Sequence, residues 1–184
     1  MSGPSRLSLA VGSGEVVLPE VGRIAVYAPR AGADLSALPS ERCHIITTFK
    51  PDSDHFAAQG LACARSAEGR YGASLVFVPR SRALAQALIA QAASVTDGPV
   101  IVDGDKKDGI ESLLKACRKR AAVSPAFSKA HGKIFSFPAG PGFEDWARGA
   151  PHQIEGGFMT LPGVFSADGI DPASRLLADS LPVK

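Results

Sequence analysis

The chain has 184 residues, enough for one ordinary domain and few for two. Hydrophobic residues make up 45 % and charged residues 21 % of it, which is the composition of a globular protein and excludes a largely disordered chain. The formal net charge of +2 is close to balance, and no apolar run approaches the roughly 20 residues of a membrane span.

Four short runs of apolar and β-branched residues predict the strands of a parallel sheet that is covered on both faces. They span residues 23–28, 44–49, 74–78 and 100–103. Helical patterns lie between these runs at residues 52–64 and 81–95, and Ser81 is the expected N-cap of the second helix.

The clearest helix is expected at residues 108–121, where four apolar residues spaced i, i+3, i+4 and i+7 from Ile110 form one stripe. Asp108 followed by Glu111 predicts a capping box at its start. Residues 122–127 and 133–137 then indicate an antiparallel hairpin. Strands and helices that alternate and close with a hairpin predict a three-layer α/β sandwich with its ligand-binding loops at the carboxyl ends of the strands.

The C-terminal part has a different pattern. Residues 139–156 are rich in proline and glycine and contain the aromatic pair Phe143 and Trp146, which predicts a linker that wraps or docks. Residues 157–161 favour a strand. Asp171 followed by Pro172 predicts the N-cap and first residue of a last helix.

The loops after the predicted strands carry little catalytic chemistry. Residues 28–34 contain no G-x-G, and Pro29 removes a backbone donor, so a cofactor site here would be degenerate. Residues 78–81 include Arg80 but no carboxylate, thiol or imidazole. We therefore expect no catalytic residue in this chain.

Neither the histidines nor the cysteines predict a metal site. The four histidines lack metal-ligand spacing with the cysteines. Cys43, Cys63 and Cys117 form no C-x-x-C and cannot all pair, which fits reduced thiols in the cytoplasm.

Basic residues concentrate between Lys106 and Lys133, where eight of them stand against two acidic residues. Such a segment suits contact with an RNA backbone, while a solvated helix face is the default interpretation and a solvated hairpin tip explains residues 128–133 as well. The candidate RNA-binding residues are Lys106, Lys107, Arg118, Lys119, Lys129, His131 and Lys133.

Two segments resemble the small-subunit ribosomal RNA guanine-N2 methyltransferases. Residues 100–109 (VIVDGDKKDG) and 128–133 (SKAHGK) resemble the end of that family's N-terminal domain, and residues 157–182 (GFMTLPGVFSADGIDPASRLLADSLP) resemble the lead-in to its catalytic "methyltransferase small" domain. The family has two class I methyltransferase-type, Rossmann-like domains, of which the first is degenerate and the second binds S-adenosylmethionine.

The resemblance implies three parts for this chain. Residues 1–138 would be the degenerate methyltransferase-like domain, 139–156 a linker, and 157–184 the lead-in to a catalytic domain that is missing here. The family's D-x-G-x-G cofactor loop and N-P-P-[FY] substrate motif are absent from the sequence. Phe165 and Ser166 match the motif beside the cofactor pocket, with Asp168, Gly169 and Asp171 completing it, although a turn and a helix cap explain the last three equally well.

The resulting hypothesis is a non-catalytic N-terminal part of a cytoplasmic rRNA methyltransferase. It would bind no cofactor itself, help to hold ribosomal RNA and support its own C-terminal catalytic domain, where S-adenosylmethionine would bind. One alternative is a structural or interaction module without direct RNA contact. Another is a separate α/β enzyme that acts on a nucleotide, for which the sequence lacks a cofactor loop.

Overall fold

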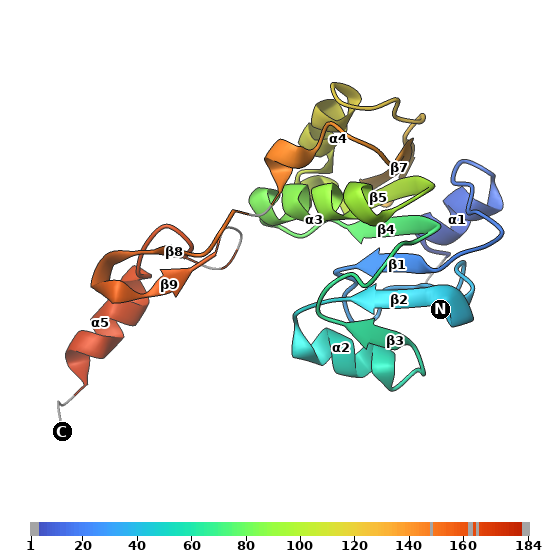
Figure 1. The fold of residues 1–184 in the computed structure, drawn as a ribbon. Helices are drawn as coiled ribbons and strands as arrows, with labels where there is room; N and C mark the ends of the chain where they lie inside the picture. Colours follow the sequence, from blue (N-terminus) through green and yellow to red (C-terminus); the bar gives the residue numbers. More distant parts are fainter. Residues whose placement is uncertain (1–3, 148, 162–163, 165, 182–184) are drawn as a thin grey trace. The chain divides into compact units, whose positions relative to one another are not determined.

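The computed structural model describes residues 4–147, 149–161, 164 and 166–181. Contacts divide the chain into two compact units, residues 1–147 and 148–184. In the first unit, a seven-stranded sheet has the order β3-β2-β1-β4-β5-β7-β6 (Figure 1). Its strands are β1 (Ile24–Tyr27), β2 (Cys43–Ile46), β3 (Ala62–Ala64), β4 (Ala73–Phe77), β5 (Pro99–Asp105), β6 (Phe127–Lys129) and β7 (Gly132–Pro138).

Strands β1 to β5 pair in parallel, and β7 joins β5 and β6 in antiparallel fashion. Two helices cover each face of the sheet: α1 (Arg6–Gly12) and α2 (Lys50–Ala57) on one, α3 (Arg82–Val95) and α4 (Ile110–Arg118) on the other. Alternate residues of β1 therefore enter different cores, Ile24 with α1 and α2, and Ala25 with α3 and α4. This confirms the predicted mostly parallel three-layer sandwich with a terminal hairpin.

The four predicted strands and the helix capped by Ser81 are confirmed within two or three residues, and Ser81 Oγ accepts a hydrogen bond from Leu84 N. The helix predicted at residues 52–64 is too long. It ends at Ala57, Gly60 takes a φ of +82°, and residues 62–64 form the edge strand β3. A positive φ ends a helix, and glycine adopts it without steric cost.

Two further predictions were wrong in detail. The helix predicted from residue 108 begins at Ile110, because the 3-10 turn η2 (Lys106–Asp108) and Gly109 at a φ of +86° precede it, so Asp108 forms no capping box. The first strand of the hairpin is Phe127–Lys129 rather than 122–127. Pro125 lacks the N–H that a ladder position there would use.

The expected linker at 139–156 is divided between the two units. Phe143 and Trp146, the latter in the 3-10 turn η3 (Glu144–Trp146), are buried in the core beneath α3 and α4. Phe143 stacks on Phe137 with ring centroids 5.0 Å apart. The contact boundary thus falls after Ala147 instead of Pro138.

The second unit is small. Its elements are β8 (His152–Gln153), the 3-10 turn η4 (Glu155–Gly157), β9 (Met159–Thr160) and α5 (Pro172–Ser180), and β8 pairs with β9. Asp171 is the N-cap of α5 as predicted, since its Oδ2 accepts from Ser174 N at 2.9 Å. Helix α5 has no buried residue.

Candidate functional site

The parallel strands β2, β1, β4 and β5 are neighbours in the sheet, so the loops at their carboxyl ends lie in one row, here called the carboxyl edge. The loops begin at Thr47, Ala28, Val78 and Lys106 respectively. In doubly wound sheets such an edge is where ligands bind, because the chain crosses between the two faces there. The carboxyl edge is therefore the candidate functional site.

The loop after β1 is bonded to the start of α2. The buried Asp52 carboxylate accepts a hydrogen bond from Ala31 N at 2.8 Å and pairs with Arg30 Nη1 at 3.4 Å. Gly32 N donates to His55 Nε2 at 3.3 Å. The backbone donors at residues 31 and 32 are thus engaged within the chain, and Pro29 has no N–H to offer. These residues do not suit a cofactor that needs open backbone donors and glycines at this loop.

The loops after β4 and β5 present basic side chains. Arg80 pairs with Asp108 across the two loops, with 3.9 Å between Nε and Oδ1. Arg82 is the first residue of α3, and Lys106 and Lys107 form the turn after β5; all three are exposed. Lys107 lies 3.9 Å from Asp105.

The β6–β7 hairpin brings its tip to the end of β5. Asp105 is opposite Gly132 in the ladder, and Lys106 N donates to His131 O at 2.9 Å. Ala130 and His131 form the two-residue turn with φ of +49° and +58°, the left-handed pair that a tight hairpin needs. Of the predicted RNA-binding residues, Lys106, Lys107, Lys129, His131 and Lys133 thus lie together, and Lys133 pairs with Glu111 at 3.5 Å.

Arg118 and Lys119 lie elsewhere. Helix α4 starts beside the carboxyl edge and runs back along the sheet for nine residues, roughly 13 Å. Its last residue is Arg118, Lys119 follows directly, and Arg120 after it bonds to Gly142 O and Asp145 beyond the end of β7. The basic segment 106–133 consequently forms two separate clusters at opposite edges of the sheet.

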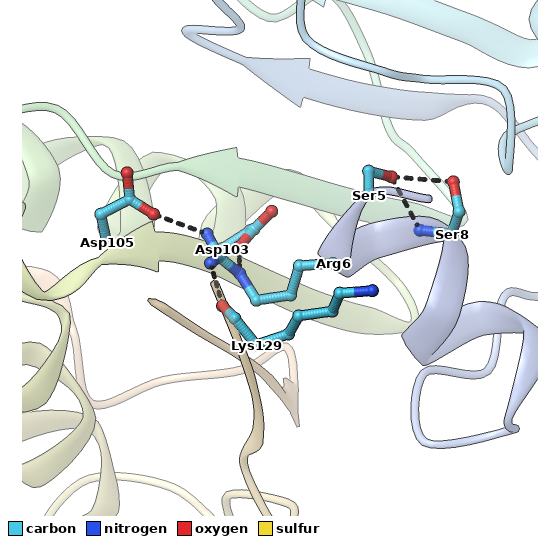
Figure 2. A network of polar contacts seen from close by, with 6 residues as sticks. All are labelled: Ser5, Arg6, Ser8, Asp103, Asp105 and Lys129. Carbon is cyan, nitrogen blue, oxygen red and sulfur yellow. Dashed lines mark hydrogen bonds and ion pairs between the residues drawn. The ribbon is translucent and has the colours of Figure 1, made fainter. Parts of the chain in front are cut away.

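Arg6 of α1 is a central residue that no local sequence pattern indicates. Its guanidinium pairs with Asp103, with Asp105 at 3.1 Å, and donates to Lys129 O at 2.9 Å (Figure 2). Burial raises the pKa of Asp103, and Arg6 counteracts part of that rise. Gly132 leaves room for this guanidinium, since a Cβ there would collide with it. Arg6 and Asp103 are 97 positions apart, so only the topology reveals the pair.

The residues matched to the cofactor motif are described only in part. Phe165 lies outside the described residues. Ser166 has a φ of +55°, and its Oγ donates to Gly169 O at 2.6 Å, which closes a local turn. Asp171 caps α5. These contacts account for Ser166 and Asp171 as structural residues.

Within the described residues, the thiols and the potential metal ligands show no reactive arrangement. Burial raises the pKa of Cys43 to about 11 and that of Cys117 to about 12, and a thiol with a raised pKa is a poor nucleophile at neutral pH. Across the described ranges, no group of three or more His, Cys, Asp and Glu side chains could hold a metal ion. None of the helices in those ranges combines the length and hydrophobicity of a membrane span.

No protein-family model matches the chain. The curated relatives include the ribosomal RNA small subunit methyltransferase C of Idiomarina loihiensis, 29 % identical over 159 residues, which cover 79 % of this chain and 48 % of that protein. The Ectopseudomonas mendocina protein of the same name is 32 % identical over 139 residues, 69 % of this chain and 42 % of that protein. The chain thus spans just under half the length of these relatives.

Solved structures show the same fold. The Thermus thermophilus structure described as 16S rRNA N2 G1207 methyltransferase in complex with AdoMet and guanosine aligns with a TM-score of 0.69 at 24 % identity, covering 89 % of this chain and 49 % of that one. A ribosomal protein L11 methylase from Lactobacillus delbrueckii aligns with a TM-score of 0.53 at 13 % identity. The fold is therefore that of the Rossmann-like methyltransferases.

Proposed function

We propose that this chain is the non-catalytic N-terminal part of an S-adenosylmethionine-dependent rRNA guanine-N2 methyltransferase, and that it helps to bind ribosomal RNA and supports the catalytic domain. The observation that carries the proposal is the extent of the sequence match. Up to 79 % of this chain aligns with rRNA methyltransferases, yet the alignment covers less than half of each.

The loop after β1 supports a non-catalytic role. Asp52 and His55 take up the backbone donors of residues 31 and 32, and Pro29 offers none. Titration calorimetry of the whole chain with S-adenosylmethionine should give no binding heat. Stoichiometric binding would contradict this part of the proposal and would favour a separate enzyme.

The second unit would connect to the catalytic domain. Its segment 157–182 resembles the lead-in to that domain, and Phe158, Met159, Leu176 and Leu177 are large apolar side chains that are exposed in the described chain. Apolar side chains exposed in this number favour a protein contact over solvent. The cytoplasm, where ribosomal RNA is methylated, would be its location.

The RNA-binding role is tested by titrating the chain with ribosomal RNA while the salt concentration is raised. If Lys and Arg side chains neutralise phosphates, log K falls linearly with log salt. A binding constant that does not change with salt concentration, or the absence of binding, would refute the RNA-binding role. The structural-module alternative would then hold, in which the sheet supports the catalytic domain alone.

A further inference from the structure

We propose that the carboxyl edge of the sheet binds single-stranded RNA, with Phe49 stacking on a base and Arg30, Arg82 and Lys106 contacting phosphates. The inference rests on the proposed function and specifies the RNA conformation and the surface that holds it. Phe49 follows β2, Arg30 follows β1, Arg82 follows β4 and Lys106 follows β5.

Phe49 is an unusual residue for this position. It precedes α2 and its residue surface is 52 % exposed, although a large aromatic side chain gains free energy by burial. Arg30 lies over its ring, with Cζ 5.5 Å from the ring centroid, and is itself held by Asp52. Asp52 thus holds the Arg30 guanidinium over the ring in the unbound chain, and a group already in place lowers the entropy that stacking costs.

Two of the ion pairs at this edge, Arg80 with Asp108 and Arg30 with Asp52, have the cation outermost. The Arg80 side chain is 88 % exposed and its partner Asp108 is 16 % exposed. For Arg30 and Asp52 the values are 73 % and 7 %. At these two pairs, a ligand that approaches from solvent consequently meets a guanidinium group before it meets a carboxylate.

The carboxylates that face this edge are already bonded within the chain. Six of them take part in ion pairs and the exposed Asp34 accepts from Ser8 Oγ and Ser36 N. The six are Asp52, Asp54, Asp103, Asp105, Asp108 and Glu111. Arg82, Lys106 and Lys129 have no ion-pair partner within the described residues, so they remain available to an anion.

The order of the strands sets the reach of the surface. Phe49 and Lys106 belong to loops that are three strand spacings apart, about 14 Å. An aromatic ring can stack only on a base that is unstacked from its neighbours, whereas the bases of a duplex are not accessible in this way. A stacking platform at one end of a basic row therefore favours a single strand over a duplex.

The stacking component is tested by fluorescence anisotropy of the whole chain with a labelled, mixed-sequence single-stranded oligoribonucleotide. Phe49→Leu should weaken binding about tenfold and leave the salt dependence unchanged, because a π-face is lost and no charge is. The matched control is Val21→Ala. Val21 precedes β1 and is an apolar residue that is exposed like Phe49, and the substitution shortens its side chain. Thermal melts verify that both variants are folded.

The charge component is tested by the slope of log K against log salt. Arg82→Gln combined with Lys106→Gln should reduce that slope by about 1.4, the value for two phosphate contacts on a single strand. Arg118→Gln combined with Lys119→Gln, at the other edge, is the matched control and should leave the slope unchanged.

The outcomes separate this inference from the proposed function. If the Arg118/Lys119 variant loses RNA affinity while the Phe49 and Arg82/Lys106 variants keep it, the RNA does not bind at the carboxyl edge, but the RNA-binding role of the chain stands. A duplex of the same sequence that binds as tightly as the single strand also overturns the inference. No binding to any RNA refutes the RNA role itself.

Discussion

His44 and Tyr71 form a buried polar pair on the face of the sheet that α3 and α4 cover. His44 Nδ1 and Tyr71 Oη are 2.6 Å apart, and Tyr71 Oη also accepts from Glu68 N at 3.0 Å. Arg23 lies over the Tyr71 ring. Burial, together with the Arg23 charge, lowers the pKa of His44 below its ordinary value of 6.5.

This lowered pKa predicts a loss of stability in weak acid. Above pH 6.5, His44 is neutral in the folded and in the unfolded chain and does not change the free energy of unfolding. As the pH falls below 6.5, the unfolded chain binds a proton at His44 that the folded chain does not bind, so the free energy of unfolding decreases. Urea unfolding from pH 8 downwards should show a smaller decrease for His44→Gln. His152→Gln, at an exposed position of β8, is the control and should match the unaltered chain. Equal acid sensitivity of all three chains would refute the role of His44.

Removing the hydroxyl of Tyr27 and removing that of Tyr71 should have opposite effects on stability. Its hydroxyl is buried at the end of β1 without a hydrogen-bond partner among the described residues, and burial raises its pKa. An unsatisfied buried hydroxyl is costly, so Tyr27→Phe should raise the free energy of unfolding by about 1 kcal/mol. Tyr71→Phe should lower it by about 1 kcal/mol, because that hydroxyl has two partners. Urea titrations measure both, and destabilisation by Tyr27→Phe would show that its hydroxyl is bonded.

At the scale of elements, Arg6 attaches α1 to the strand β5 and to the hairpin strand β6 (Figure 2). Arg6→Met leaves the buried Asp103 carboxylate without its partner and should cost about 3 to 5 kcal/mol. Adding Asp103→Asn should recover a large part of that loss, because the unpaired charge disappears. Lys50→Met, which breaks the exposed pair with Asp54, is the control and should cost less than about 0.5 kcal/mol. Additive effects of the two substitutions would refute the coupling.

The sequence was a good guide to elements that are buried on both faces. Every residue of β1 and β2 is buried, so short runs rich in apolar and β-branched residues were sufficient to identify them. The edge strand β3 (Ala62–Ala64) is partly exposed and carries two alanines, which gives no strand pattern. Helix α1 is only seven residues long, and its anchor is an ion pair with a distant strand, which no local pattern encodes.

The candidate site could be predicted only as a set of charges. The sequence placed Lys106, Arg118 and Lys133 in one basic segment, but the length of α4 puts Arg118 at the opposite edge of the sheet. Phe49 and Arg30 carried no signal, because neither belongs to a motif and their contact depends on two parallel strands being neighbours. Residue types and spacing identify chemistry, whereas topology decides which groups meet.

At the scale of the whole molecule, the aromatic pair Phe143 and Trp146 fixes where the first unit can end. Trp146 meets Phe143 edge to face at 5.3 Å, and Arg120 lies over the Trp146 ring at 4.7 Å from its centroid. The largest fully buried side chains all lie between Leu7 and Phe137. The two aromatic residues therefore close a core that the rest of residues 1–147 builds.

A chain that ends at Ala147 should accordingly unfold in one cooperative transition at nearly the temperature of the whole chain, since every buried hydrophobic residue of the described structure is retained. A chain that ends at Pro138, the boundary expected from the sequence, loses both aromatic residues and should be less stable by about 3 kcal/mol or more. Differential scanning calorimetry of the three chains measures this order. Replacing both Phe143 and Trp146 by alanine in the whole chain should reproduce the loss, because the cause is the missing rings and not the shorter length. Equal melting temperatures for the chains ending at Pro138 and Ala147 would place the boundary at the earlier position.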